Sequence, residues 1–575
     1  MQNPQLLQMS TYSQAHICQC LTRISTLRRN ATVTITGTRR KTGEIFVENV
    51  LSLASGLVEV VGLKPGDVVA ISALNSDLYM EWLLAVTYVG GICAPLNYRW
   101  SLEEAKSAME VVRPILLVTD VSSNYWHSNF QADTISSIKW HVLMDHSVEL
   151  DITANGVPSF PLLTTEMLKK SSIKSKSLNY IWGPDGAAII CFTSGTTGRP
   201  KGVTLSHSAF IIQSLAKIAA VGYGENDVYL HTAPLYHIGG LSSAISMLMV
   251  GGCHVLMPKF EAALALKAIN QYEVTSFITV PAILADMVSV IRTTETRDRL
   301  LSVNKILNGG GSLSVELLKD AVQTFPRSKI ISAYGMTEAC SSLTFMTLYD
   351  STKENSVQSS MNEKSNLHEP RGVCVGKTAP HVELEINSED VSHSGRILAR
   401  GPHMMLGYWG QIPTTKDSVP CNGGWFDTGD IGRLDNDGNV WLIGRTNGRI
   451  KSGGENVYPE EVEAVLLEHP GVSRAVVVGL PDTRLTEIVV ACIQLKPKWM
   501  WTDYCSKPSA KDNYQCLSSE ILQNFCREKN LTRFKVPKYC IIWTKSLPLT
   551  TTGKLRRDQV RSEVMSHTQL LSSRL

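Results

Sequence analysis

The chain has 575 residues, of which 43% are hydrophobic and 19% charged, so it is long enough to bury more than one core. Its 55 Lys and Arg residues nearly balance its 52 Asp and Glu residues and leave a formal net charge of +3, which gives no basic excess of the kind that binds nucleic acid or an anionic membrane. The longest apolar stretches, residues 83–96 and 244–257, contain glycine and are shorter than the roughly 20 residues that cross a bilayer. We therefore expect several packed units, no membrane span and no nucleic-acid partner.

The thirteen cysteines are scattered, and the closest pair, Cys18 and Cys20, has one residue between them. Without a C-x-x-C pair the sequence offers neither a zinc site nor a redox motif. The odd count and the absence of a signal-peptide apolar core favour a reducing, intracellular compartment over a disulfide framework.

The first 43 residues contain no Asp or Glu but several Arg, Ser and Thr residues, as organelle transit segments do. Residues 31–37 (ATVTITG) are typical of a β-strand and a turn, so we assign residues 1–30 as a targeting or extension segment. A removable leader could therefore take only the extreme N-terminus without damaging the domain.

From there to about Asp350, β-branched runs alternate with helical periods. Ser101, followed by Glu103 and Glu104, predicts the start of a helix, while residues 115–119 and 276–280 predict strands. This alternation predicts an α/β class with a layered architecture.

A second unit is predicted near the C-terminus. Residues 434–443 are typical of a hairpin, and Pro459 opens a helix with one apolar stripe. We place the boundary so that residues 31–445 form an N-terminal domain and residues 446–575 a small C-terminal α+β domain. Residues 356–370 and 496–518 are predicted to be surface loops.

The strongest chemical signal is residues 193–202, TSGTTGRPKG, which follow the apolar run at residues 187–192. A strand that leads into a loop of hydroxyl, glycine and lysine residues can wrap donors around phosphate oxygens. Pro200 stands before Lys201, so the loop is no Walker motif, and no G-x-G-x-x-G opens a helix here. Taken alone, the segment is also compatible with a flexible Ser/Thr/Gly linker.

Four further segments follow in order: YGMTE at 334–338, GWFDTGD at 424–430, GR and IKSGGENVYPEEVE within 444–463, and PLTTTGK at 548–554. With TSGTTGRPKGV, they resemble the adenylate-forming acyl-CoA synthetases over residues 33–557. The resemblance implies the acyl-CoA synthetase/luciferase-like fold, in which a large layered α/β N-terminal domain carries a small mobile α+β C-terminal domain. It also implies ATP, coenzyme A and Mg²⁺ as cofactors or co-substrates, and a small-molecule carboxylic acid as substrate.

The resemblance assigns roles to individual residues. Glu338 would hold Mg²⁺, a hard cation that prefers oxygen ligands, and Thr337 would reach the α-phosphate. Tyr334 would stack on the adenine, and Asp430 with Arg445 would grip the ribose hydroxyls. The phosphate loop would consist of Thr193, Ser194, Gly195, Thr196, Thr197 and Lys201, and the shelf under the adenine of Gly309, Gly310 and Gly311.

In the C-terminal domain, Lys554 resembles the lysine that stabilises charge on the α-phosphate when this domain closes. The departure from the family lies at Asn447 and Gly448, where charged or acidic hinge residues are usual; both residue types tolerate positive φ, so rotation is retained. After rotation, the loop that begins at Lys451 would face the active site, and Gly453 and Gly454 would leave a channel for pantetheine.

For the acid, residues 234–240 (PLYHIGG), 309–314 (GGGSLS) and 339–342 (ACSS) resemble 2-succinylbenzoate-CoA ligases, which serve phylloquinone and menaquinone synthesis. The resemblance places His237, Ser341 and Ser342 beside the substrate, and we count His237 with Thr337, Glu338 and Lys554 as catalytic. Polar donors suit a dicarboxylate, whose second carboxylate must be paired when buried.

Other readings remain open. His237 is also compatible with the packed aromatic wall of a fatty-acid ligase, and a 4-coumarate-like or medium- to long-chain fatty acyl-CoA ligase would share every ATP motif. A carrier-loading adenylation protein would use protein-bound pantetheine. A non-enzymatic nucleotide-binding regulator is disfavoured because it would need neither Glu338 nor Lys554.

The last three residues, Ser573, Arg574 and Leu575, resemble a peroxisomal address of the S-K-L type. This predicts a peroxisomal import receptor as partner and the peroxisome as location. The acid-free N-terminus is typical of a plastid or mitochondrial address, and the resemblance to plant members of the subfamily implies a second pool in the chloroplast.

Overall fold

The computed structural model describes residues 15–120, 122, 135–145, 162–171, 179–194, 200–293, 300–353, 372–388, 394–410, 424–452, 455–482, 485–502, 515–529, 531, 533–549 and 555–572. Two compact units divide the chain. The first comprises residues 1–358, 376–383 and 399–426, and the second comprises residues 359–375, 384–398 and 427–575. The boundary predicted at residue 445 stays a prediction, and each unit is described by itself.

The first unit contains a sheet of eight strands, in which β7, β6, β5, β3, β4 and β8 run parallel. Strands β9 and β19 extend it antiparallel beyond β8. In spatial order the strands are β19 (Gly407–Tyr408), β9 (Pro200–Ser206), β8 (Ala187–Ser194), β4 (Ile92–Pro95), β3 (Val68–Ser72), β5 (Leu116–Thr119), β6 (Trp140–Leu143) and β7 (Leu162–Thr164).

A second sheet of this unit has six parallel central strands, β14, β13, β12, β10, β11 and β1, with antiparallel strands on both sides. In spatial order these are β16 (Val373–Thr378), β15 (Ser341–Asp350), β14 (Lys329–Met336), β13 (Lys305–Asn308), β12 (Ser276–Thr279), β10 (Val228–His231), β11 (Cys253–Leu256), β1 (Thr32–Thr36) and β2 (Arg39–Thr42). Parallel strands of this kind are covered on both faces, which explains their continuous apolar runs.

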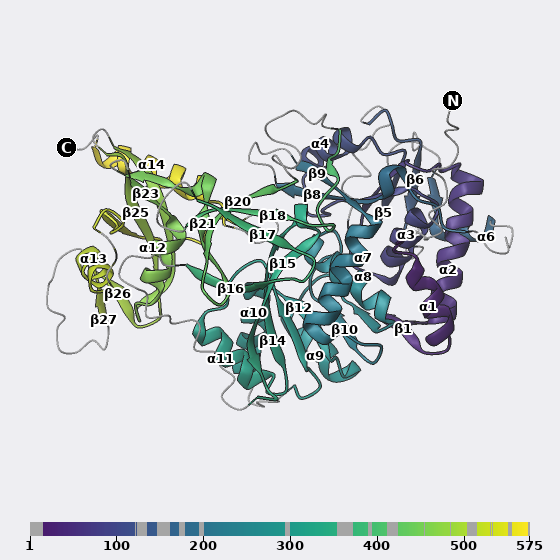
Figure 1. The fold of residues 1–575 in the computed structure, drawn as a ribbon, viewed down its shortest axis with the longest axis horizontal. Helices are drawn as coiled ribbons and strands as arrows, with labels where there is room; N and C mark the ends of the chain where they lie inside the picture. The colour runs from purple at the N-terminus through teal and green to yellow at the C-terminus, as the bar shows by residue number, and fades with distance from the viewer. Residues whose placement is uncertain are drawn as a thin grey trace, which may run out of the picture. The chain divides into compact units, whose positions relative to one another are not determined.

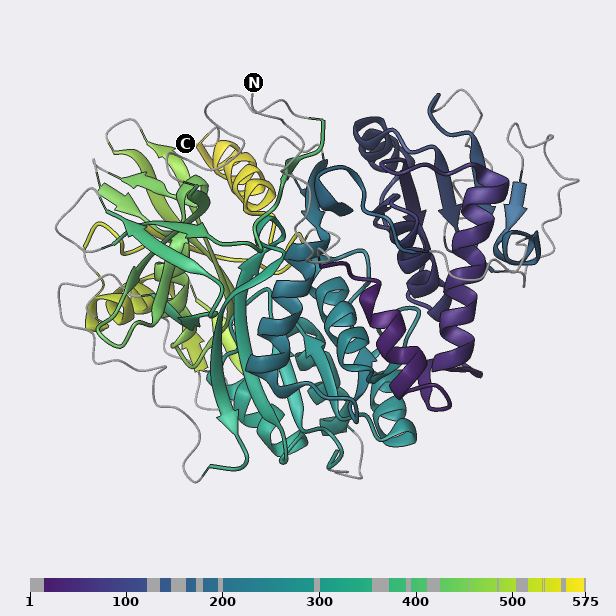
Figure 2. The same ribbon diagram turned by 45° about the vertical axis from the view of Figure 1, so that its right-hand side comes forward.

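Helices fill the space between and around these sheets (Figure 1). They are α1 (Gln19–Leu27), α2 (Gly43–Gly56), α3 (Asp77–Tyr88), α4 (Leu102–Val112), α6 (Thr165–Ser171), α7 (His207–Lys217), α8 (Ile238–Val250), α9 (Ala262–Tyr272), α10 (Pro281–Thr293) and α11 (Val315–Thr324). Helix α8 packs on β10, β11 and β12 and also on α7, which in turn contacts β9, so the α7–α8 pair lies between the two sheets. Figure 2 shows the same ribbon after a turn of 45°, with the helices of this unit in purple to teal.

Helix starts follow the capping rules. Ser101 and Glu104 form a reciprocal capping box at α4, as the sequence predicts, and Ser206 caps α7 by accepting a hydrogen bond from the Ala209 N–H at 3.1 Å. Because β9 ends at Ser206, the strand passes directly into the helix, which fixes the position of α7 relative to the phosphate segment.

The second unit contains strands β17 (Glu383–Asn387), β18 (Gly395–Arg400), β20 (Phe426–Leu434) and β21 (Val440–Arg445) in that order, and a separate sheet of β23 (Glu455–Val457), β22 (Ile450–Ser452), β25 (Thr486–Leu495), β24 (Val472–Asp482) and β28 (Tyr539–Ile542). Its helices are α12 (Pro459–Leu467), α13 (Ser519–Glu528) and α14 (Arg557–Ser572). Along β24, Val477 packs with residues of α12 and α13, whereas Val476 and Val478 pack with residues of α14. This alternation buries both faces of the sheet.

Most predicted elements are confirmed: β1, β5, β12, the β20–β21 hairpin and the start of α12 lie where the sequence places them. The predicted loop at residues 496–518 is wrong in part, because β26 (Trp499–Trp501) and β27 (Gln515–Leu517) pair in parallel. The side chain of Trp499 lies against Gly471 and against His469, which also contacts Phe525. Aromatic burial thus adds structure to a segment rich in polar residues. The other predicted loop, residues 356–370, lies outside the described residues.

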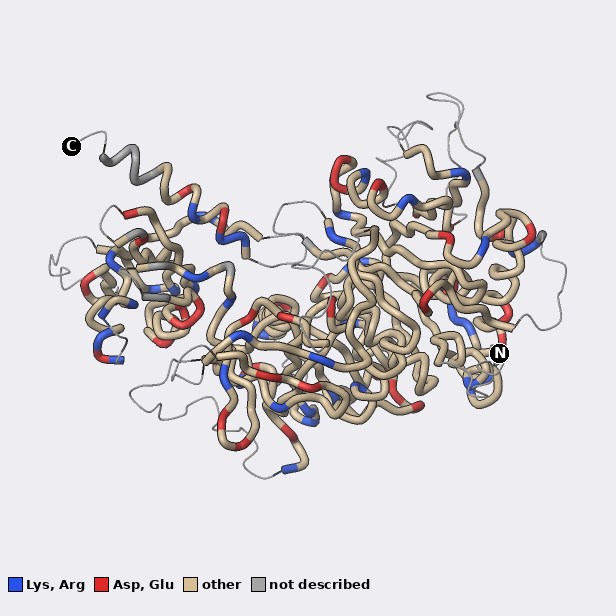
Figure 3. Tube along the Cα trace, turned by 45° about the horizontal axis from the view of Figure 1, so that its top comes forward, with Lys and Arg blue, Asp and Glu red and all other residues tan. Residues whose placement is uncertain are grey.

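Charge is dispersed along the chain, with Lys and Arg interleaved with Asp and Glu (Figure 3). Among the described residues, no helix is both long enough and apolar enough to cross a membrane. The cysteines of the described segments are all unpaired, and most are buried.

Candidate active site

The phosphate segment is the end of a hairpin between β8 and β9. Thr193 pairs with Lys201, and Ser194 with Pro200, so these residues come together where the two strands separate. Gly195, Thr196 and Thr197, which the sequence assigns to the same loop, lie outside the described residues. The Lys201 ammonium lies over the ring of Tyr408, 5.1 Å from its centroid, within the range of a cation–π interaction.

Tyr408 also contacts the predicted magnesium ligand. Its hydroxyl donates to Oε1 of Glu338 at 3.0 Å, and Glu338 is only 9% exposed. Burial and the adjacent Glu338 carboxylate raise the pKa of Tyr408 far above its ordinary value, so the phenol stays protonated and donates. Tyr408 therefore links the phosphate strand to the YGMTE segment. Sequence reasoning missed it, because Gly407–Tyr408–Trp409 carries no motif of its own.

The backbone around Tyr408 holds the same two segments. The Met405 N–H donates to the Glu338 carbonyl at 2.8 Å, and the Trp409 N–H donates to the Gly202 carbonyl at 2.7 Å. Within the described part of the chain, the second carboxylate oxygen of Glu338 has no hydrogen-bond partner. A buried carboxylate with one oxygen available fits a single protein ligand to Mg²⁺, which usually keeps waters and substrate phosphates as its other ligands. The described residues hold no cluster of three or more metal-ligating side chains.

A tight turn between β14 and β15 presents Glu338 and Thr337. Gly335 pairs with Ser342, and a Cβ atom at Gly335 would lie 1.6 Å from the Ser341 carbonyl oxygen, so only glycine fits here. Cys340 and Ser341 have φ values of 52° and 120°, which are rare for residues with a side chain. Such strained backbone at the end of a catalytic motif is typical of functional sites.

The predicted adenine residues lie at the carboxyl ends of neighbouring strands. Gly309, Gly310 and Gly311 follow β13, and Tyr334 lies in β14 next to it. The Asn308 side chain donates to the Gly311 carbonyl at 2.7 Å and Gly310 has a φ of 71°, which together fix the turn. A Cβ at Gly309 would meet no atom within 4 Å, so the backbone there borders open space.

The predicted acid-binding residues lie at two further points of the first unit. His237 caps α8, with Nδ1 accepting from the Gly239 N–H at 3.2 Å. Ser342 is held by Gln213 of α7, whose amide, oriented to satisfy its neighbours, accepts from the Ser342 N–H at 3.2 Å and donates to the Ser342 carbonyl at 3.1 Å. Gln213 is a second functional neighbour that the sequence did not indicate, because a lone Gln inside a helix carries no motif.

In the second unit, Asp430 and Arg445 are opposite each other on β20 and β21, and Arg445 Nε lies 2.9 Å from Asp430 Oδ1. The structure thus brings the two predicted ribose residues together. Lys451 lies in β22, paired with Asn456. Gly453, Gly454 and Lys554 lie outside the described residues, although the Leu549–Leu555 bridge brings the chain on the two sides of Lys554 together.

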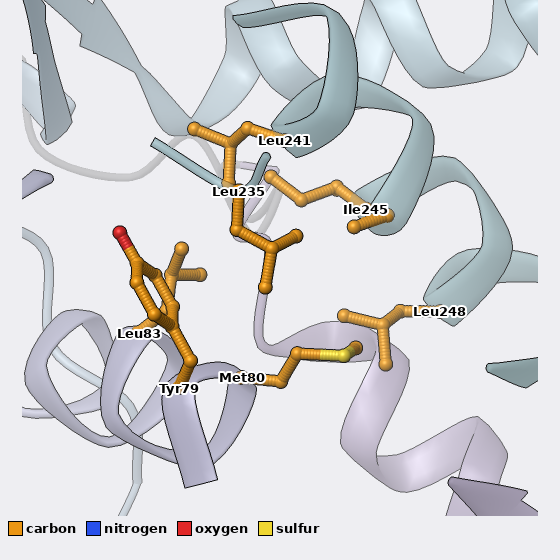
Figure 4. A pocket seen from close by; sticks show the side chains of 8 residues that line it. Tyr79, Met80, Leu83, Leu235, Leu241, Ile245 and Leu248 are labelled. Carbon is orange, nitrogen blue, oxygen red and sulfur yellow. The ribbon is translucent and has the colours of Figure 1, made fainter. Parts of the chain in front are cut away.

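One small cavity lies between α3 and α8. Its volume is about 10 Å³, and it is lined by side chains of both helices, among them Met80 and Leu248, and by Leu235, which precedes α8 (Figure 4). It has no room for more than a water molecule, so it is not an acyl-chain pocket.

The AMP-binding enzyme family matches residues 22–409, and the AMP-binding enzyme C-terminal domain matches residues 461–554. The chain belongs to this family. The family match confirms the predicted superfamily and fold class, with a large α/β domain followed by a smaller C-terminal domain.

Similar proteins are found over the full length. A 2-succinylbenzoate–CoA ligase of Arabidopsis thaliana, named chloroplastic/peroxisomal, is 58% identical over 573 residues, which cover 99% of this chain and 100% of that protein. The o-succinylbenzoate CoA synthetase of Bacillus subtilis, solved with its acyl-adenylate intermediate, is 26% identical with a TM-score of 0.73, covering 95% of this chain and 98% of that one. The same synthetase solved with ATP and a magnesium ion is 26% identical with a TM-score of 0.72, covering 95% and 99%.

These similarities confirm the predicted enzyme class, an AMP-forming acid–CoA ligase that uses ATP and CoA. They do not test the roles of the individual site residues, which stay proposals.

Proposed function

We propose that this protein converts 2-succinylbenzoate to 2-succinylbenzoyl-CoA through an acyl-adenylate, as a step of phylloquinone or menaquinone synthesis. The observation that carries the proposal is the 58% identity to the plant ligase over 99% of the chain. The geometry supports it, because the phosphate hairpin, Glu338 and the acid-side segments 237–240 and 341–342 belong to one compact unit.

In the first half-reaction, an oxygen of the substrate carboxylate attacks the α-phosphorus of ATP in line, and pyrophosphate leaves. Lys201 and the hydroxyls of Thr193 and Ser194 hold the β- and γ-phosphates, and Thr337 reaches the α-phosphate. Glu338 would hold Mg²⁺, which would neutralise phosphate charge when bound. Lys554 stabilises the charge that develops on the α-phosphoryl oxygens.

In the second half-reaction, the CoA thiol attacks the carbonyl carbon of the acyl-adenylate, and AMP leaves. An acyl-adenylate is an activated mixed anhydride, so a thiol with a pKa of about 8.5 needs no dedicated base. Rotation about Asn447 and Gly448 exchanges Lys554 for the segment from Lys451 to Gly454, which admits the pantetheine arm.

Pyrophosphate release with a panel of acids tests the proposal. We expect 2-succinylbenzoate to be used with a higher kcat/KM than 4-coumarate or a medium-chain fatty acid. Glu338→Gln should lose this activity, whereas Glu383→Gln, at an exposed ion pair with Arg400, should retain it. Preference for 4-coumarate or a fatty acid would overturn the proposed substrate. If no acid of the panel were turned over, the result would favour the alternative of a nucleotide-binding regulator.

For location, we propose peroxisomal import through the C-terminal Ser573–Leu575 by a peroxisomal import receptor, with a second pool in the chloroplast. The name of the Arabidopsis relative, chloroplastic/peroxisomal, supports both compartments. A fluorescent protein fused to the N-terminus should give punctate peroxisomal signal that disappears when residues 573–575 are deleted. Unchanged puncta after the deletion would contradict this address.

A further inference from the structure

Lys217, the last residue of α7, is a fully buried lysine. Its side chain is 0% exposed, and its Nζ lies 2.5 Å from Ser242 Oγ and 3.2 Å from Ser243 Oγ. Among the described residues no carboxylate pairs with it. Lysine is almost never fully buried unless it is paired.

Other lysines of this chain that have little exposure form ion pairs with carboxylates. Lys41 lies 2.7 Å from Asp77, Lys169 lies 2.9 Å from Glu81, and Lys535 lies 2.7 Å from Glu461. Each is paired with a buried carboxylate. Lys217 therefore departs from the pattern of its own chain, and a buried charge that lacks a partner is costly.

The hydrogen-bonding capacity of Lys217 is also unfilled. An ammonium has three N–H donors, and two described acceptors, both hydroxyls, are within reach. Burial lowers the pKa of Lys217 to about 7, against a smaller opposing effect of the Cys340 thiol. An anion placed beside Nζ would fill the third donor and restore the charged form.

The position of Lys217 in the fold indicates which anion would bind beside its ammonium group. One turn earlier on α7, Gln213 makes hydrogen bonds to the backbone of Ser342. Lys217 itself is close enough to Cys340, which directly precedes Ser341, to interact with it electrostatically. On its other side, Ser242 and Ser243 lie on α8, one to two turns after His237. Lys217 thus lies between the two segments that the sequence assigns to the acid.

We propose that Lys217, assisted by the hydroxyls of Ser242 and Ser243, binds the carboxylate of a dicarboxylic acid that does not react with ATP. The inference rests on the proposed function, since it concerns how the same site selects its acid. It makes Lys217 a specificity-determining residue: a monocarboxylic acid would leave its ammonium buried and unpaired, whereas a dicarboxylic acid would supply the missing counter-charge.

The direct test uses substitutions of Lys217 and analogues of 2-succinylbenzoate. 4-Oxo-4-phenylbutanoate lacks the aromatic carboxyl group of 2-succinylbenzoate, and 2-butanoylbenzoate has a methyl group in place of the carboxyl group of the succinyl chain. The informative analogue is the one that keeps the carboxyl group that reacts with ATP. For Lys217→Met, which keeps the length of the side chain, we expect the KM for 2-succinylbenzoate to rise on the order of 10- to 100-fold, the effect of losing a charge-assisted hydrogen bond. The KM for ATP and the kinetics with the analogue should change little, so the preference for the dicarboxylic acid is lost.

Two further variants complete this test. Lys217→Gln removes the charge but keeps a donor to the serines, and it should lose the same preference. Ser246→Ala, a buried position on α8 whose hydroxyl donates to the Ser242 carbonyl at 2.8 Å, is the matched control and should keep the preference. If wild-type protein uses 2-succinylbenzoate and both Lys217 variants retain the preference, this inference is wrong while the proposed function stands. If wild-type protein does not use the acid, the proposed function itself fails.

A measurement on the wild-type protein covers the case in which neither variant folds. At pH 8 most of a lysine with a pKa of about 7 is neutral, so binding of the second carboxylate should take up close to one proton. Calorimetric titration in two buffers of different ionisation enthalpy measures this uptake, which should be absent with the analogue. The Cys340 thiol, whose pKa burial raises well above its ordinary value, stays protonated and does not interfere. Equal proton uptake with both acids would contradict the inference.

Discussion

Removal of one hydroxyl tests whether Tyr408 positions Glu338, the proposed magnesium ligand. In Tyr408→Phe, Glu338 Oε1 loses the donor that lies at 3.0 Å, whereas the ring under the Lys201 ammonium remains. A hydrogen bond to a charged group contributes about 1.5–3 kcal/mol, which corresponds to roughly 10- to 150-fold in rate if the bond acts fully in the transition state. We therefore expect adenylate formation to slow by about that factor.

The assay is pyrophosphate release at a series of Mg²⁺ concentrations. The lost hydrogen bond orients the Glu338 carboxylate and does not contact the acid substrate. The Mg²⁺ requirement and the KM for ATP should therefore rise, while the KM for the acid substrate should stay the same. Tyr349→Phe serves as the control, since its hydroxyl donates to the Pro326 carbonyl at 3.4 Å, within the same unit but away from this motif. An unchanged Mg²⁺ dependence in Tyr408→Phe would refute the positioning role, even if the rate fell.

Three further predictions concern the motifs. Lys554→Ala should slow adenylate formation by on the order of a hundredfold or more but spare thioester formation from preformed acyl-adenylate; equal loss of both half-reactions in single-turnover measurements would refute the assignment. Gly335→Ala should lower the melting temperature and the activity because its Cβ would overlap the Ser341 carbonyl, whereas Gly224→Ala, which has room for a Cβ, should do neither. His237→Ala should raise the KM for the acid much more than that for ATP, and a similar rise in both would contradict its place beside the acid.

The sequence predicted the local parts of the site well. The sequence predicted a strand that leads into a loop with Thr193 and Lys201. The structure adds a second strand, β9, which pairs Thr193 with Lys201 at the end of a hairpin. The family resemblance assigned Asp430 and Arg445 to the same ribose, and residues 434–443 separately predicted a hairpin. The structure pairs the two residues across β20 and β21, the strands of that hairpin. In both cases the contact is made within one hairpin, and register follows from alternation and turn chemistry.

The sequence could not predict contacts between segments that are far apart in the chain. Tyr408 lies 70 residues after Glu338 in the chain, and nothing in Gly407–Tyr408 indicates that a two-residue strand will pair with β9. Gln213 and Lys217 have the spacing of polar residues on an ordinary helix face, and only the packing of α7 between sheets shows that both are buried. Tertiary placement, not residue type, gives these side chains their chemistry.

Helix α7 connects the two halves of the proposed chemistry. It begins where β9 ends, so its first turn is continuous with the strand that carries Lys201, and Gln213 and Lys217 reach the segments assigned to the acid. In-line attack requires the carboxylate and the α-phosphorus to be held at a fixed separation, and small displacements of either reactant cost rate. A short helix packed on both sides is stiffer than a loop would be, because its backbone hydrogen bonds are internal and its side chains are locked in the core. The helix that continues the strand of Lys201 can therefore also set the position of the acid. Selection of the acid at Lys217, as proposed, would then act on the geometry of the reaction as well as on binding.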